Sequence, residues 1–261
     1  MNQKIKWLRN KLLSLDLQGM VITNPISIRY LTGINAEGIL LITRKENVYI
    51  TDGRYIEQVN SILTIDDEIF VNNIKDLTLD DYEGFFTFCE NVGFEEFNIT
   101  YSKYKEYIQK YQINNFEETD GIIEKQRMIK DEDEIAKIKK ACSITDDCFE
   151  HIKKFIKVGQ TEKEIALEIE RFFRLNGADS LAFDTIVASG INSSMPHAVP
   201  TDKKIEEGDP ITIDMGCKYE GYCSDMTRTV FAKRIPSEIK TIYDLVLKKQ
   251  IQIAEEMKDG V

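Results

Sequence analysis

The sequence contains few of the residues that mark several large classes of protein. Only 2 of its 261 residues are histidines and only 1 is tryptophan, and its 5 cysteines are an odd number without any CxxC spacing. This cysteine pattern fits reduced thiols better than a disulfide framework or a structural zinc site. No apolar run reaches the roughly 18 residues that a membrane helix needs. We therefore expect a soluble chain without a membrane partner.

Basic patches and leader segments are also missing. Lys and Arg number 34 against 45 Asp and Glu, a net charge of -11, and no basic cluster is interleaved with aromatic residues. Such a chain does not attract phosphate backbones, so we expect no nucleic-acid partner. The first ten residues have no continuous hydrophobic stretch and no small-residue cleavage site, which predicts a cytoplasmic protein.

What the sequence does contain predicts two domains. The chain is 42% hydrophobic and long enough for two cores. Residues 1 to about 120 alternate a helical stripe with short apolar runs at 20–22, 39–42 and 48–51, which is typical of an α/β domain. The helical stripe is formed by Ile5, Leu8, Leu12 and Leu15.

Three helices are predicted in the second half. The first begins after the acidic run 131–134 and should bury a stripe of apolar residues. Thr161 and Glu164 form a capping box for the second helix, and Ser237 is the expected N-cap of the third. The stripe of the first helix consists of Ile135, Ile138, Cys142, Phe149, Ile152 and Ile156.

A faint internal repeat relates the ends of the first and third helices. Aligning Gly159 with Gly260 also superposes Ile152 on Ile253 and Lys157 on Lys258. Chance could produce this match. If the repeat is real, a second helical unit starts near residue 237 and is incomplete, so we expect the chain to be a fragment.

Two aspartates are the main candidates for chemistry. Two β-rich runs flank residues 218–221 and predict a hairpin whose loop is Tyr219 and Glu220, which places Asp214 directly opposite Asp225. Cβ atoms in such a pair lie roughly 5 Å apart, so the two carboxylates repel each other unless a cation compensates them. Hard oxygen ligands favour manganese, cobalt or zinc. The alternative is that both aspartates are solvated or lie on opposite faces of a slipped hairpin.

His197 is the second candidate. It lies in a loop at 188–200 that is dense in turn-forming residues and has a proline on either side of the histidine. An imidazole held in this way can hydrogen-bond a reacting carbonyl or its oxyanion. A purely structural hydrogen bond is the alternative role. The other histidine, His151, falls on the first long helix and is assigned no chemistry.

Taken together, these segments resemble the pita-bread metallopeptidase family, and within it the Xaa-Pro aminopeptidase and prolidase branch. The resemblance covers almost the whole chain. It implies a creatinase-type α/β N-terminal domain at 1–122, then an α+β pita-bread catalytic domain at 123–261, of which about the first half is present. In the first domain it rests on the strand and loop segments Asn24–Gly33 and Ile50–Tyr55, and in the second on Ile129–Ile135, Ile186–Gly190, Pro196–His197, Ile213–Gly216 and Ser224–Thr229.

The resemblance also implies site residues and a reaction. Asp214 and Asp225 correspond to the first two ligands of two divalent metal ions, Mn²⁺ before Co²⁺ or Zn²⁺, and His197 to a non-ligand histidine that contacts the substrate. The complete protein would be a two-metal exopeptidase, an Xaa-Pro aminopeptidase or an Xaa-Pro dipeptidase. Family members add a histidine and two glutamates further along the chain, and no histidine follows Asp225. We therefore expect the 261-residue chain alone to be inactive.

Partners and rival functions follow from the same resemblance. The implied partners are proline-containing peptides or Xaa-Pro dipeptides, and we expect a homo-oligomer, a dimer, with apolar surface exposed on the half-domain. One rival is a non-catalytic pita-bread peptide-binding or chaperone-like module, against which the retained aspartates argue. A creatinase-like amidinohydrolase is a second rival because it shares the first domain.

Overall fold

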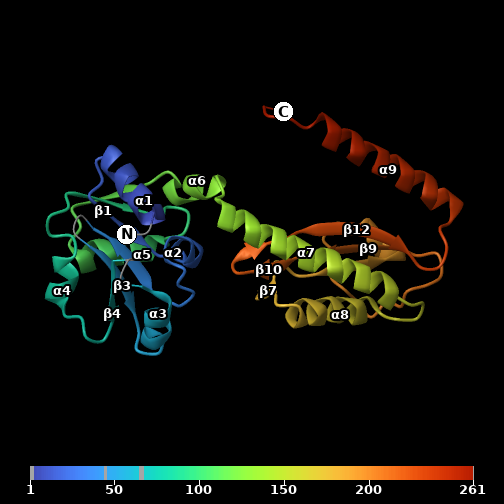
Figure 1. Cartoon of the computed structure of the whole chain (residues 1–261), viewed down its shortest axis with the longest axis horizontal. Helices are drawn as coiled ribbons and strands as arrows, with labels where there is room; N and C mark the ends of the chain where they lie inside the picture. The colour runs from blue at the N-terminus through green and yellow to red at the C-terminus, as the bar shows by residue number, and fades with distance from the viewer. Residues whose placement is uncertain (1–2, 44–45, 65–67, 261) are drawn as a thin grey trace. The chain divides into compact units, whose positions relative to one another are not determined.

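A computed structural model describes residues 3–43, 46–64 and 68–260. The chain divides into two compact units, residues 1–129 and 130–261, each of which is described by itself (Figure 1). The division lies after the helix at 122–128, whereas the sequence places it before that helix. None of the described helices is both long and apolar enough to cross a membrane.

The first unit is an α/β domain built on one six-stranded sheet. Its strands lie in the order β4-β3-β2-β1-β5-β6, and β2 pairs antiparallel with β1 and β3 while the other pairs are parallel. The helices are α1 (Gln3–Ser14), α2 (Pro25–Thr32), α3 (Ile56–Ile62), α4 (Leu79–Gly84), α5 (Tyr101–Tyr111) and α6 (Ile122–Met128). The strands are β1 (Gly19–Ile22), β2 (Ile39–Ile42), β3 (Asn47–Thr51), β4 (Ile69–Asn73), β5 (Asn91–Phe94) and β6 (Asn115–Glu118).

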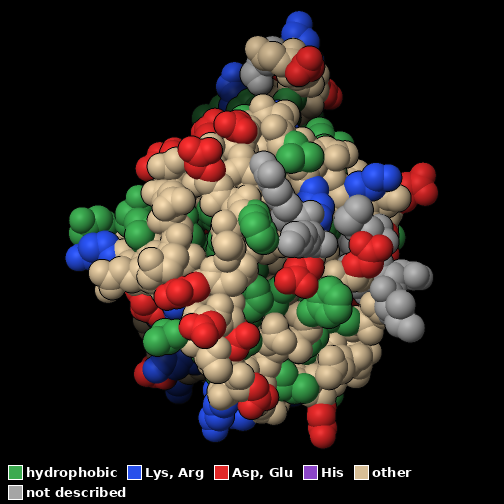
Figure 2. Space-filling view, turned by 90° about the vertical axis from the view of Figure 1, so that its left-hand side faces the viewer, with side chains coloured by type: hydrophobic (Ala, Val, Ile, Leu, Met, Phe, Trp, Pro, Cys, Tyr) green, Lys and Arg blue, Asp and Glu red, His purple; other side chains and the backbone are tan. Residues whose placement is uncertain are grey.

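Each face of this sheet has its own hydrophobic core. Successive side chains on a strand point to opposite faces, so Met20 and Ile22 join the core under α1, α2, α3 and α6 while Val21 joins the core under α4 and α5. Figure 2 shows one outer face of this unit, on which acidic, basic and apolar side chains are interspersed without a gathered basic patch among the described residues. The predicted α/β class of this half is confirmed.

One segment of the first unit differs from the expectation of strand and loop. The residues between Asn24 and Gly33 form helix α2. The Asn24 side chain accepts a hydrogen bond from the N–H of Ile26, Pro25 occupies the first turn, and Gly33 ends the helix at a φ of 77°. These are the residue types that begin and end a helix, so the local signal for α2 was present in the sequence.

The second unit packs two helices against one face of antiparallel strands. One sheet has the order β12-β9-β8 and the other β11-β10-β7. Ile211, Ile213 and Met215 alternate along β9 and enter a core that includes Ile144 and Ile165 of the helices. The elements are α7 (Glu132–Phe155), α8 (Glu162–Leu175), β7 (Ser180–Leu181), β8 (Ile186–Ser189), the 3-10 helix η2 (Gly190–Ser194), β9 (Pro210–Met215), β10 (Cys217–Tyr219), β11 (Tyr222–Cys223), β12 (Met226–Phe231) and α9 (Ser237–Glu256).

Helix α7 forms as predicted but buries only part of the predicted stripe. Its N-terminus is a capping box between Asp131 and Glu134. Two members of the predicted stripe, Ile135 and Cys142, are exposed. Ile152 of that stripe is buried as predicted, and Phe149 and Ile156 pack against the same core. The buried face also includes Ala141, Ile144, Thr145 and Cys148, which the predicted stripe did not contain.

Helices α7 and α9 end in the same way. Ile156 and Met257, the residues after the two helices, are extended and donate their N–H groups to the carbonyls of Ile152 and Ile253. Gly159 and Gly260 follow with φ values of 93° and 82°. The local match found by aligning these glycines therefore corresponds to a shared backbone geometry. At the start of α9, Pro236 rather than Ser237 occupies the N-cap position.

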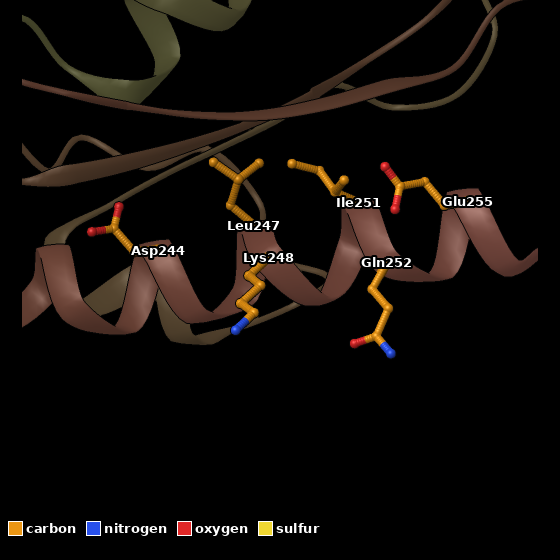
Figure 3. A pocket seen from close by; sticks show the side chains of 6 residues that line it. All are labelled: Asp244, Leu247, Lys248, Ile251, Gln252 and Glu255. Carbon is orange, nitrogen blue, oxygen red and sulfur yellow. The ribbon is translucent and has the colours of Figure 1, made fainter.

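Helix α9 contains no buried residue. Leu247 and Ile251 point to one side of the helix, in a groove, whereas Lys248 and Gln252 point to the opposite side (Figure 3). Ile242, Val246 and Ile253 of this helix are also more than half exposed. This agrees with the expectation of exposed apolar surface in the second unit.

Candidate active site

The hairpin that carries the two aspartates forms, but in another register. Tyr219 pairs with Tyr222, so the loop consists of Glu220 and Gly221, whose φ values are 46° and 86°. A tight two-residue hairpin turn requires positive φ at both positions. The prediction assigned positive φ to Gly221 alone. It therefore placed the loop at Tyr219 and Glu220, one residue too early. In the observed register Asp214 pairs with Thr227.

Asp214 and Asp225 therefore lie diagonally and not face to face. The Ser224 N–H donates to the Cys217 carbonyl at 2.9 Å, which keeps the same register up to the residue before Asp225. Because Asp225 precedes Thr227 by two positions, alternation puts both aspartates on one face of the ladder. Diagonal neighbours have Cβ atoms roughly 7 Å apart. Their mutual repulsion is weaker than expected, and the space between them is larger.

The face of the sheet that carries Asp214 is the one opposite α7 and α8. Asp214 is half-buried on the central strand β9, where its Oδ1 accepts a hydrogen bond of 2.8 Å from the Thr227 hydroxyl. Asp225 is exposed and immediately precedes β12. Burial alternates along β9, and Thr227 is the partner of Asp214 only in the observed register.

Buried polar contacts hold the chain just before Asp225. The hydroxyl of Ser224 lies 2.6 Å from that of Thr145 on α7 and accepts from the Cys217 N–H at 3.0 Å. Gly216 passes so close to this segment that an added Cβ would overlap the Ser224 carbonyl oxygen. The sequence signal for these contacts was weak, because Ser, Thr and Gly occur in many hairpins.

His197 lies in the loop that connects η2 to residue 201, and its side chain is exposed. Ser189, which precedes η2, and Thr201, at the end of the loop, both bind Glu162, the first residue of α8, which sequence reasoning did not identify. Burial raises the pKa of Glu162, and hydrogen bonds from Thr201 and Ser189 outweigh burial and lower the pKa below its usual range. Glu162 is therefore a buried carboxylate that stays ionised.

The aspartates fit part of a divalent-metal site. Carboxylate oxygens suit hard ions such as Mn²⁺, and Asp214 and Asp225 share one face. No group of three or more His, Cys, Asp or Glu side chains in the described part of the chain could hold a metal ion. The chemistry of the two carboxylates is compatible with such an ion, and no third side chain of these types joins them among the described residues.

Both halves of the chain match known families. Residues 4–129 match the creatinase/prolidase N-terminal domain, and residues 136–261 match metallopeptidase family M24. An uncharacterized peptidase of Bacillus subtilis is 38% identical over 261 residues, which covers 99% of this chain and 73% of that protein.

Solved structures have the same fold. An Xaa-Pro dipeptidase from Bacillus anthracis has a TM-score of 0.86 at 38% identity and covers 95% of this chain and 70% of its own. An X-Pro aminopeptidase from Thermotoga maritima has a TM-score of 0.87 at 32% identity and covers 97% of this chain and 73% of its own. Fold and comparisons thus define a metallopeptidase with a creatinase-type first domain. The chain belongs to metallopeptidase family M24, as the resemblance implied.

Proposed function

We propose that this chain belongs to a metal-dependent exopeptidase that cleaves peptide bonds next to proline, as an Xaa-Pro dipeptidase or an Xaa-Pro aminopeptidase. The main support is that alternation along the paired strands places Asp214 and Asp225 on the sheet face opposite α7 and α8. The loop of His197 leaves from the end of β8, which pairs with β9. The activities named for the Bacillus anthracis and Thermotoga maritima relatives support the proline preference.

In this proposal each residue has a defined role. Asp214 and Asp225 bind divalent metal, Mn²⁺ before Co²⁺ or Zn²⁺, and a bound metal pair would supply a nucleophilic water. Thr227 orients Asp214 through the 2.8 Å hydrogen bond. His197 donates a hydrogen bond to the substrate carbonyl and stabilises the charge that develops on its oxygen. A cytoplasmic location and a dimer stay predictions.

A titration with Mn²⁺, followed by NMR, tests the metal role. Mn²⁺ is paramagnetic and broadens the signals of nearby nuclei, so residues 212–216 and 225–229 should broaden first. Asp214→Asn should abolish this selective broadening, because it removes the half-buried ligand charge. The control Asp202→Asn alters an exposed aspartate that pairs with Lys163 and should leave the broadening unchanged. Broadening that Asp214→Asn does not affect would exclude the proposed site.

Adding the dipeptide Gly-Pro to samples that contain Zn²⁺ in place of Mn²⁺ tests the substrate role, because Zn²⁺ is diamagnetic and does not broaden nearby signals. We expect Gly-Pro to shift the imidazole signals of His197 only when the metal is bound. A shift that does not depend on metal would favour a peptide-binding module instead. We also expect this chain alone not to hydrolyse Gly-Pro, since two carboxylates leave a two-metal site under-coordinated. Rapid Mn²⁺-dependent hydrolysis would contradict that last expectation.

A further inference from the structure

We propose that Glu162 is a positioning residue that holds the His197 loop, residues 189–201, in place at the candidate active site. Glu162 does not itself contact a substrate in this proposal. It acts by positioning His197, so the inference rests on the proposed function, in which His197 contacts the substrate. The geometry that carries it is independent of any metal or peptide.

One carboxylate binds both ends of the His197 loop. The Oε1 atom of Glu162 accepts from the N–H of Ser189 at 2.7 Å and from its hydroxyl at 2.8 Å. The Oε2 atom accepts from the N–H of Thr201 at 3.0 Å and from its hydroxyl at 2.6 Å. The side-chain amide of Asn192 donates to both oxygens, at 3.1 and 3.2 Å. The loop is thus tied at its start, at η2 and at its end.

Helix capping does not explain this arrangement. The capping box of α8 is made by Thr161 and Glu164, which satisfy each other's backbone N–H groups. Glu162 is next to them in sequence, yet it is 0% exposed and directs its oxygens at the loop. Burying a carboxylate is costly unless it is fully hydrogen-bonded. Such a residue fits a defined structural task better than a solvated helix N-terminus.

The chemistry also requires a carboxylate at this position. All groups that face Glu162 are donors: two backbone N–H groups, two hydroxyls and an amide. A glutamine would present its own NH₂ group to one pair of donors and could accept from only one end of the loop. Glu162→Gln should therefore release one end of the loop. The size of the side chain at position 162 stays almost the same.

An ion pair extends the hydrogen-bond network of Glu162 toward the strand of the proposed metal ligand Asp214. Lys203 donates to the Ser189 hydroxyl at 3.1 Å and to Asp209 Oδ2 at 2.7 Å. Asp209 immediately precedes β9, the strand that carries Asp214. Hydrogen bonds thus connect Glu162, through Ser189 and Lys203, to the start of that strand. This network fixes the His197 loop relative to the strand of the proposed metal ligand.

NMR of the full chain tests the proposal directly. The chain has only two histidines, so its imidazole spectrum contains the signals of two rings. The His197 signals report on the loop, and the His151 signals serve as an internal reference. In Glu162→Gln we expect amide hydrogen exchange to accelerate at least about tenfold at whichever of residues 189 and 201 faces the new NH₂ group, since that amide loses its acceptor. The His197 ring signals should shift or broaden, while those of His151 should not.

Glu164→Gln is the matched control, because it alters an exposed glutamate in the same helical turn. It should weaken the α8 cap and leave loop exchange and the His197 signals unchanged. A folded Glu162→Gln protein with unchanged exchange and unchanged His197 signals would overturn the proposal. If that variant does not fold, Thr201→Val removes only one hydroxyl donor and must show the same effects at a smaller size. None of these readouts needs metal or peptide, so a failed Mn²⁺ titration would reject the proposed function and not this inference.

Discussion

The position of Asp225 is determined mainly by the contacts of neighbouring residues. The residue before it, Ser224, is buried and bonds to Thr145 and Cys217. Gly216 lies against the Ser224 carbonyl with no space for a side chain. A backbone atom cannot move away as a flexible side chain can. Gly216 is therefore the residue at which the smallest chemical change should disturb the candidate metal ligands.

We predict that Gly216→Ala destabilises the second unit and weakens Mn²⁺ binding. The added methyl group must displace the strand at Ser224, and overpacking of this kind costs about 1–3 kcal/mol. Urea unfolding measures the stability, and the Mn²⁺ titration measures the binding. Gly84→Ala is the control, because an added Cβ there meets nothing within 4 Å. Equal behaviour of the two variants would show that the close approach at Gly216 is not a constraint.

At the scale of elements, the contact between α7 and α8 contains a charged cluster. Glu168 on α8 accepts from Arg171 at 2.7 Å and lies 2.6 Å from His151 Nε2 on α7. The His151 ring stacks on Phe172 with a centroid distance of 5.0 Å. Hydrogen bonding to Arg171, and then to His151, lowers the pKa of Glu168 to about 2 against the opposing effect of burial.

This pKa predicts an acid-sensitive contact between the two helices. A carboxylate whose pKa is lower in the folded than in the unfolded state stabilises the fold above its unfolded pKa, about 4.3, and loses that contribution as the pH falls toward 2. We expect Glu168→Gln to be less stable than the unmodified chain at pH 7 and to lose less stability between pH 5 and 2. Urea unfolding at several pH values measures this. Glu170→Gln on the same helix should keep the original pH dependence.

The elements also show which features could be predicted from sequence. The capping box at Thr161, the helix that opens at the acidic run 131–134 and the apolar strands of the first unit depend on neighbours in the sequence, and they form as predicted. The hairpin register depended on whether Glu220 adopts positive φ, which the sequence does not signal strongly. The role of Glu162 could not be predicted, because its partners lie 27 and 39 residues away. The buried face of α7 was predicted only in part for the same reason, because it depends on strands that are distant in the sequence.

At the scale of the molecule, each unit has cores of its own. Two clusters of buried residues cover the two faces of the first sheet, and a third lies between α7, α8 and the strands of the second unit. The apolar residues of α9 belong to none of these clusters among the described residues. The stability of each unit should therefore depend mainly on its own core. The candidate site residues should lose their arrangement when the second unit unfolds.

A pair of core substitutions tests this independence. Leu40 and Ile213 are both fully buried, one in each unit, and truncating such a side chain costs about 2–5 kcal/mol. The single tryptophan, Trp7, lies on α1, so its fluorescence reports the first unit alone. We predict that Leu40→Ala moves the tryptophan transition in urea to lower concentration, whereas Ile213→Ala leaves it in place and moves only part of the circular dichroism signal. Cores that unfold separately should also give additive effects in the double variant. If Ile213→Ala shifts the tryptophan transition as far as Leu40→Ala does, the two units unfold in one cooperative transition. Substitutions at the candidate site would then change the stability of the whole chain.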